Sequence, residues 1–384
     1  MANIKVNPNS FIPSGEMIRE LANQSYISES DVKTILRQRG IFTPTNNKDK
    51  TVSILSCLLL SPPEFEVLVE RQTVKEDNLK SAGSGKIAVN STFTNLTSFI
   101  HDNYIPDLVS QLSPKSESLK NNFKIVGVPI VKTIEKDKEI EVEINIERSN
   151  YNKSWVNHKS QFKGIVNFKH DQNEVTFQRF FTSNESKAVV EKSVSIFEKK
   201  CKELKLIDEK QLEHRIRFND FNNDERIQFF LKIYNSDESR SLSIEGLDVS
   251  LFEFAPDTSL SLPSELKWMD NKEELIFRGK RVETTFFLNE IKYYQHLIVW
   301  RMQAVFKFEL VGRGVKGKVK VDFNFHEYFK DKSHKAPLEI NILSALDLEN
   351  GTNLTLSQKE TAKKEILTKL ETIKSAIYNK HFSK

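Results

Sequence analysis

The chain has 384 residues, of which 38% are hydrophobic and 29% charged, as in a soluble globular protein of two or three domains. It contains only 12 glycines and 11 prolines, which excludes long disordered linkers. The formal net charge is +4, which is too small to indicate a nucleic-acid partner by itself. Any such surface must therefore come from local clusters of cations.

Several features bear on the compartment. The longest apolar run, residues 54–60, is far too short to cross a bilayer, and the first residues lack the apolar stretch of a signal peptide. Cys57 and Cys201 are isolated in apolar helical patterns, so we expect both to be buried in a reducing compartment. The sequence therefore predicts a cytoplasmic protein without membrane contact.

Residues 1–80 are predicted to form a small helical domain. Ser28, with Asp31 three residues later, is typical of a helix start, and Gly40 of a helix end. A further helix is predicted to start at Pro62. Between them, residues 52–59 have the spacing of a helix with one apolar face, formed by Val52, Leu55, Leu58 and Leu59.

Residues 81–120 are predicted to hold a linker and connecting helices. The best linker candidate is the stretch at residues 80–86, which contains Gly83, Ser84, Gly85 and Lys86. These residues match the end of a phosphate-binding P-loop, but Lys80 stands where the first glycine is needed and Ile87 where Ser or Thr is needed. The linker interpretation is therefore preferred over nucleotide binding.

Residues 121–384 are predicted to form a larger, mostly antiparallel β-rich domain with packed helices. Ile140, Val142, Ile144 and Ile146 alternate with acidic or polar residues, which indicates a half-buried strand. Strands are also expected at residues 162–168 and 174–181, a hairpin at 304–311 and 318–325, and helices at 190–204, 224–234 and 362–377. No internal repeat is visible. The predicted fold class is α+β.

The strongest functional pattern lies in residues 28–60. An apolar helix ends on Arg37, Arg39 and Gly40, a polar loop follows, and Lys48 and Lys50 begin a second helix. This pattern resembles the SAP-type helix-extended-loop-helix module. The resemblance implies that these cations, together with free N–H groups at the second helix, contact phosphates. The long loop and the apolar residues 57–60 leave a protein-docking surface open as the alternative.

A second basic segment lies at Gly312-Arg313-Gly314-Val315-Lys316-Gly317. It has the letters of a dinucleotide-binding motif, but strand patterns both precede and follow it, so it is interpreted as a hairpin turn. A β-ribbon of this kind can lie against a phosphate backbone, or it can be a lysine-protected sheet edge. The candidate nucleic-acid residues are Arg313, Lys316, Lys318 and Lys320.

A third basic segment, residues 151–169, interleaves lysines with aromatic residues. Trp155 and Phe162 could stack on bases beside the cations, although we favour them as core residues with the lysines as a solvated face. The candidate residues here are Lys153, Lys159 and Lys163.

Enzymatic chemistry has weaker support. Asp248 with Glu265 and Lys267 fits the letters of a Mg²⁺-dependent nuclease, but Pro263 precedes the glutamate and indicates a loop or helix start rather than a strand. Glu141, Glu143 and Glu147 are interpreted as the solvent-exposed face of their strand. There is no metal-type histidine pair, no activated cysteine and no nucleophile elbow. No catalytic residue, metal or cofactor is predicted.

The sequence thus favours a non-catalytic nucleic-acid-binding subunit of a multi-protein complex, with DNA as the preferred ligand and RNA left open. In composition it is similar to components of bacterial anti-phage operons. A divergent Mg²⁺-dependent nuclease is the first alternative. The second is a scaffold or homo-oligomerising subunit that docks a protein partner through residues 52–60 and the helix at 359–378.

Overall fold

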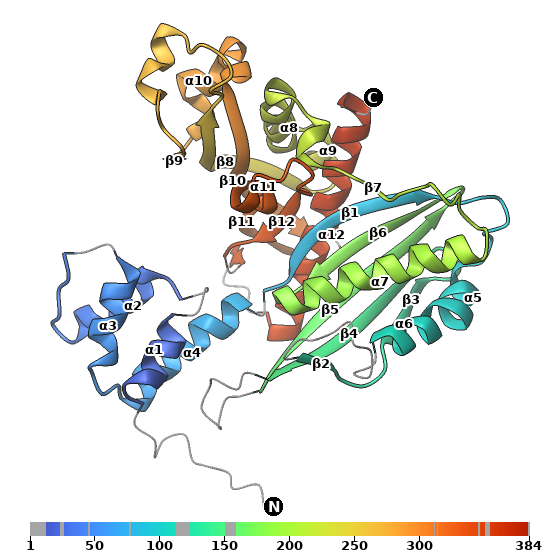
Figure 1. The fold of residues 1–384 in the computed structure, drawn as a ribbon, viewed down its shortest axis with the longest axis horizontal. Helices are drawn as coiled ribbons and strands as arrows, with labels where there is room; N and C mark the ends of the chain where they lie inside the picture. Colours follow the sequence, from blue (N-terminus) through green and yellow to red (C-terminus); the bar gives the residue numbers. More distant parts are fainter. Residues whose placement is uncertain are drawn as a thin grey trace, which may run out of the picture.

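The computed structural model describes residues 13–23, 27–44, 47–76, 78–112, 123–149, 159–310, 312, 314–344, 346–349 and 354–382. A small helical domain precedes a large antiparallel sheet with packed helices (Figure 1), which confirms the predicted α+β class. Among the described residues, no helix has the length and apolar character that a membrane span requires.

The N-terminal domain consists of helices α1 (Glu16–Ala22), α2 (Glu29–Gln38), α3 (Lys48–Ser56) and α4 (Pro62–Glu76). The predicted cap is present, because the Ser28 hydroxyl accepts from Asp31 N–H while the Asp31 carboxylate accepts from Ser28 N–H. Gly40 follows α2 with φ 74°, as a helix-ending glycine requires. The helices enclose a core of their own, which includes Ile18, Val32, Leu36, Val52 and Leu55.

The predicted linker at residues 80–86 is wrong, because these residues form strand β1 (Lys80–Ala88) in the middle of the sheet. One edge of β1 pairs with β6 (Glu174–Phe181), and the other pairs with β12 (Glu339–Ile342) and β7 (His214–Arg215). Gly83 has φ +89°, and a Cβ there would lie 2.8 Å from the Leu338 carbonyl oxygen. The glycines therefore reflect close packing rather than flexibility.

The sheet contains 13 strands in the order β2-β4-β5-β6-β1-β12-β11-β10-β8-β9, with β3, β7 and β13 paired to β4, β1 and β11. All pairs are antiparallel. The remaining strands are β2 (Phe123–Ile125), β3 (Ile130–Glu135), β4 (Glu139–Ser149), β5 (Lys159–Asp171), β8 (Ile244–Pro256), β9 (Leu275–Arg278), β10 (Leu297–Leu310), β11 (Val315–Asn324) and β13 (Asp347–Leu348).

The same order of secondary-structure elements occurs in each half of the sheet. This repeat is not visible in the sequence. A strand, short helices, an antiparallel meander and a long helix occur first as β1 to α7 (Asn184–Glu203) and again as β7 to α12 (Leu356–His381). The other helices are α5 (Leu96–Ser98), α6 (Ile105–Leu112), α8 (Asn223–Asn235), α9 (Asp237–Ser241), α10 (Phe286–Asn289) and α11 (His326–Asp331). Short π and 3₁₀ turns are η2 (Phe99–Tyr104), η3 (Phe218–Asp220), η4 (Ser264–Met269), η5 (Val282–Thr284) and η6 (Ile291–His296).

Helix α12 joins the two halves. Its predicted apolar face is buried, with Ile366, Leu370 and Ile373 in the core of the second half. At its N-terminal end, Lys364 contacts Glu141 of β4, whose side chain is only 6% exposed. The interpretation of Glu141 as part of a solvent-exposed face is therefore wrong, because α12 covers it.

Of the other sequence predictions, several are confirmed and two are wrong. The strand pattern at Ile140–Ile146, the helices now seen as α7 and α8, and the β10–β11 hairpin are confirmed. Cys201 is buried as expected, but Cys57 is exposed at the end of α3. Leu59 was assigned to an apolar helix face, yet it lies beyond α3 and is 64% exposed.

Candidate nucleic-acid interface

Arg39 at the end of α2 is engaged inside the N-terminal domain. Its Nε and Nη2 donate to the two carboxylate oxygens of Glu64 on α4, at 2.8 and 2.5 Å. The same carboxylate accepts from the backbone and hydroxyl of Ser61. The hydrogen bonds from Arg39, supplemented by those from Ser61, lower the pKa of Glu64 to about 2. Arg39 therefore links the end of α2 to α4 through its contact with Glu64.

The N-terminus of α3 is also less open than the sequence suggested. The Asn47 side-chain oxygen accepts from the backbone N–H groups of Asp49 and Lys50, at 2.9 and 3.2 Å. Those donors are therefore already occupied. Lys48 is half-buried and already interacts with another part of the chain. Arg37 and Lys50 are exposed, and neither has a partner among the described residues.

The hairpin between β10 and β11 has the predicted form. Leu310 pairs with Val315, so the glycine-containing motif is a turn between strands and not the start of a helix. Lys316 forms an ion pair with Glu309 at 2.9 Å, whereas Lys318 is exposed without a partner in the described part of the chain. Arg313 lies outside the described residues.

Lys320 lies two residues further along the same face of β11. Burial and, after it, the positive charges of Arg278 and Arg301 lower the pKa of Lys320. Arg301 itself is neutralised by Asp322 and Glu253, at 2.6 and 2.8 Å. The negative charge of Asp322 acts on the pKa of Lys320 in the opposite direction, so Lys320 lies among charges of both signs.

The third basic segment contributes little that can be placed. Lys153 lies outside the described residues. Lys159 is the first residue of β5, but the structure does not describe its side chain. Lys163 forms an ion pair with Glu360 of α12 at 2.7 Å. Phe162 is 5% exposed, which agrees with a core position.

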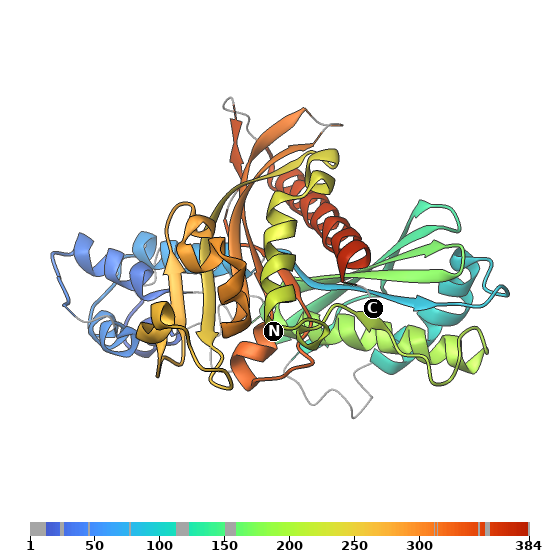
Figure 2. The same ribbon diagram turned by 90° about the horizontal axis from the view of Figure 1, so that it is seen from above.

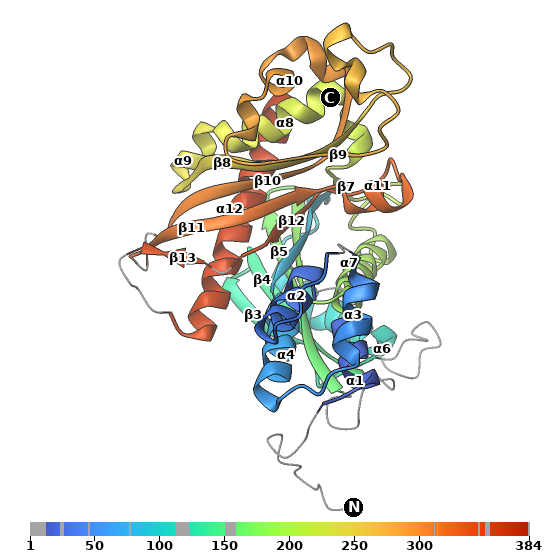
Figure 3. The same cartoon turned by 90° about the vertical axis from the view of Figure 1, so that its left-hand side faces the viewer.

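Two of the predicted basic segments lie on one side of the molecule. Val319, Val321 and Phe323 of β11 share a core with α8 and α12, so the alternating Lys318 and Lys320 belong to the opposite face of the sheet. In Figure 2, α8 and α12 lie on one side of strands β8, β10 and β11, and the N-terminal helices lie on the other. Figure 3 looks onto that second side and shows the N-terminal helices together with β10 and β11.

The sequence interpretation missed cations in the same part of the sheet as the hairpin. Arg278 ends β9, and Lys280 and Arg281 follow in an exposed turn. Lys307 of β10 is exposed beside Lys318. The signal was present as the dense run Arg278-Gly279-Lys280-Arg281. Strand pairing places this run beside β8, which in turn pairs with β10 of the hairpin.

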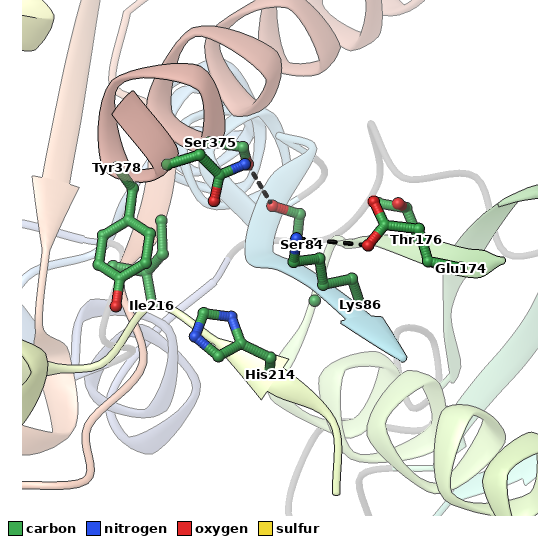
Figure 4. Close-up of a pocket in the computed structure, with 10 residues that line it drawn as sticks. Ser84, Lys86, Glu174, Thr176, His214, Ile216, Ser375 and Tyr378 are labelled. Atoms are coloured by element: carbon green, nitrogen blue, oxygen red, sulfur yellow. Dashed lines mark hydrogen bonds and ion pairs between the residues drawn. The ribbon is translucent and has the colours of Figure 1, made fainter. Parts of the chain in front are cut away.

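A small pocket lies elsewhere, where β1, β6, β7 and the end of α12 meet (Figure 4). Its volume is about 110 Å³, well below the roughly 300–1,000 Å³ of typical small-molecule sites. Ser84 and Ser375 hydroxyls lie 3.3 Å apart across it, and Lys86 forms an ion pair with Glu174 at 3.3 Å. The pocket is therefore no candidate for a nucleotide or a large cofactor.

The residues weighed for metal chemistry have other partners. Glu265 lies in the turn η4, as expected for a position after Pro263, and accepts from the Ser264 hydroxyl at 2.8 Å. The Asp248 carboxylate accepts from the backbone N–H of Arg281. In the described portion of the chain, no group of three or more His, Cys, Asp or Glu residues is arranged to hold a metal.

The fold is that of an α+β protein in which a small helical N-terminal unit precedes a large antiparallel sheet with packed helices. Residues 16–78 match the family model described as the GAPS4b protein N-terminal domain, a defence-associated family. The SAP-type resemblance is not confirmed. A search of curated proteins finds no match.

One solved structure with similarity is described as the DynU16 crystal structure, a putative protein in the dynemicin biosynthetic locus. It covers 78% of this chain and 97% of its own, at 10% identity and a TM-score of 0.21. A similarity this low supports no conclusion about fold or function.

Proposed function

We propose that the protein is a non-catalytic nucleic-acid-binding subunit in anti-phage defence, with DNA as its ligand. The match of residues 16–78 to a domain of a defence-associated family supports the defence context. The observation that carries the binding proposal is the shared side of the molecule. Exposed Lys318 and half-buried Lys320 face this side of the sheet, and the N-terminal domain, which carries the exposed Arg37 and Lys50, lies on the same side. Cations gathered on one side can neutralise several phosphates of one duplex.

The test is a binding titration of the full chain with a fluorescently labelled DNA duplex at several salt concentrations. We expect the logarithm of the affinity to fall linearly with the logarithm of salt concentration, by about 0.9 for each neutralised phosphate. Incubation of the same complex with Mg²⁺ or Mn²⁺ should leave the DNA intact. Absence of binding, or an affinity that salt does not change, would refute the proposal, and cleavage would favour the nuclease alternative.

A docking or scaffold subunit is a second candidate, compatible with the first. It is favoured by apolar side chains that the N-terminal domain leaves exposed, with Phe42 at 77% and Leu59 at 64%. The other predicted docking element, α12, already packs its apolar face inside the chain. Copurification with the product of a neighbouring gene, lost on Phe42→Ser with Leu59→Ser, would support this candidate.

A further inference from the structure

The cations of β10 and β11 are arranged unfavourably for folding. Lys307 is paired directly opposite Lys318, and both side chains are exposed without an ion-pair partner among the residues described. Like charges directly opposite each other on neighbouring strands destabilise a sheet. Lys320, on the same face, is half-buried and lies close enough to Arg278 and Asp322 to experience both charges. The contact between Lys307 and Lys318 therefore lowers the stability of the sheet, and a ligand of negative charge would relieve this repulsion.

The turn after β9 adds further cations and is held in place by its backbone. Gly279 N–H donates to the Ser250 carbonyl at 3.1 Å, and Arg281 N–H donates to the Asp248 carboxylate. Arg281 has φ 56°, a left-handed conformation that is uncommon for a residue other than glycine. The side chains of Arg278, Lys280 and Arg281 are exposed. The turn is therefore fixed against β8 while its cations remain available to a ligand.

Neighbouring acids offset this charge only in part. Glu245 is paired opposite Lys307, and Asp347 opposite Lys318, but neither carboxylate forms an ion pair within the described residues. Asp248 is engaged by the backbone of Arg281, and Glu309 by Lys316. The surface thus keeps cations from three strands that form no ion pair with an acid in the described part of the chain.

We infer that this cationic sheet face, formed by Arg278, Lys307, Lys318 and Lys320 and flanked by the turn residues Lys280 and Arg281, is the main phosphate-contacting surface for double-stranded nucleic acid. The inference rests on the proposed function. It assigns the main binding surface to β9, β10 and β11 instead of the helical domain. Within this account, Arg37 and Lys50 are accessory contacts, since Arg39 is occupied by Glu64.

A duplex fits this face better than a single strand. The residues that share the face on β10 and β11 include no aromatic side chain; they are Arg301, Gln303, Val305, Lys307, Glu309, Lys316, Lys318, Lys320, Asp322 and Asn324. Single-strand binding relies on aromatic stacking platforms in addition to cations. Contact through cations alone reads the phosphate backbone and carries little sequence information.

The test compares two double variants of the full chain that remove the same charge. Lys307→Ala with Lys318→Ala removes two cations from the proposed surface. Arg240→Ala with Lys380→Ala removes two cations from α9 and α12, which lie on the opposite side of the sheet. Circular dichroism and thermal melting should first show that both variants remain folded. Affinity for a 30-base-pair duplex and for a single strand of equal length is then measured across salt concentrations.

We expect the Lys307/Lys318 variant to lower the salt slope by about 2 and the affinity at 0.1 M salt by tenfold to a hundredfold, whereas the control pair changes neither. The wild type should prefer the duplex. If the wild type binds and the Lys307/Lys318 variant keeps its slope, the inference is overturned while the proposed function stands. If both variants lose affinity equally, or single strands bind as well as duplex, the inference is also overturned. A wild type that binds no nucleic acid would refute both.

Discussion

Arg37 and Arg39 are only two residues apart, yet the structure gives them different surroundings. Arg37 is exposed without a described partner, while Arg39 holds the Glu64 carboxylate through two hydrogen bonds. A basic-x-basic pattern at a helix end predicts both as ligand contacts. The sequence could not separate them, because Glu64 lies 25 residues away and meets Arg39 only after α2 and α4 pack together.

Replacing Arg39 with alanine should therefore affect stability, and replacing Arg37 should not. We expect Arg39→Ala to lower the free energy of unfolding by about 1 kcal/mol, because it removes a bidentate, half-exposed ion pair. Arg37→Ala serves as the control, with a change within about 0.5 kcal/mol. Urea denaturation followed by circular dichroism measures both. Equal effects of the two variants would contradict this assignment.

The Glu64 contact should also give a defined pH dependence. Its pKa is lowered from 4.5 to about 2 in the folded chain, so the contact stabilises fully above pH 4.5 and is lost as the pH falls toward 2. The difference in unfolding free energy between wild type and Glu64→Gln should therefore shrink between pH 6 and pH 3. A difference that stays constant over this range would show that the carboxylate is not preferentially ionised by the fold.

At the scale of elements, strands and helices with regular apolar spacing could be predicted, and β1 could not. The strand predicted from the alternation at Ile140–Ile146 is confirmed, and so is the helix predicted from the spacing of Ile366, Leu370 and Ile373. One face of each element is buried, which is why the sequence shows a regular period. In β1 the small residues Gly83, Ser84 and Gly85 give no such period. Their requirement comes from neighbours far along the chain, including Leu338 and Glu213.

Substitution of Gly83 and of Gly127 should have clearly different effects on stability, because only Gly83 is crowded by neighbouring residues. Gly83→Ala should destabilise the protein by about 2–4 kcal/mol, because a side chain there meets the Leu338 carbonyl in addition to the strained φ. Gly127 has a similar φ of +74° but nothing within 4 Å, so Gly127→Ala should cost only about 1 kcal/mol. Thermal melting of both variants provides the measurement, and equal shifts would argue against crowding at β1.

At the scale of the whole molecule, α12 contacts β1 through a carboxylate that is buried together with a lysine of the same helix. Glu371 and Lys374 are at most 1% exposed, and Glu371 also accepts from the Ser81 hydroxyl and the Ser84 N–H. Lys374→Met should cost about 3–5 kcal/mol, because it leaves a buried carboxylate unpaired. Removing the surface pair of Glu365 and Lys369 by Glu365→Gln should cost under about 0.5 kcal/mol. Similar losses in denaturant titrations would contradict this account.

The candidate interface could be predicted only in pieces. Lys318 and Lys320 were identified because they are close in sequence to a recognisable turn. Arg278 and Lys307 were missed because no local pattern links them to β11. Sheet pairing places β10 directly beside β11, and β9 in the same sheet beyond β8. A surface assembled from several strands is a property of topology, which residue spacing within one strand does not encode.

The most direct test of the central claim is chemical modification of lysines in the full chain, read by mass spectrometry with and without saturating duplex DNA. The account predicts that DNA slows modification of Lys280, Lys307 and Lys318 strongly and that of Lys50 to a smaller extent. Lys232 and Lys380, on the α8 and α12 side, should react at unchanged rates. Protection of Lys232 and Lys380 with continued reactivity of Lys307 and Lys318 would contradict the account.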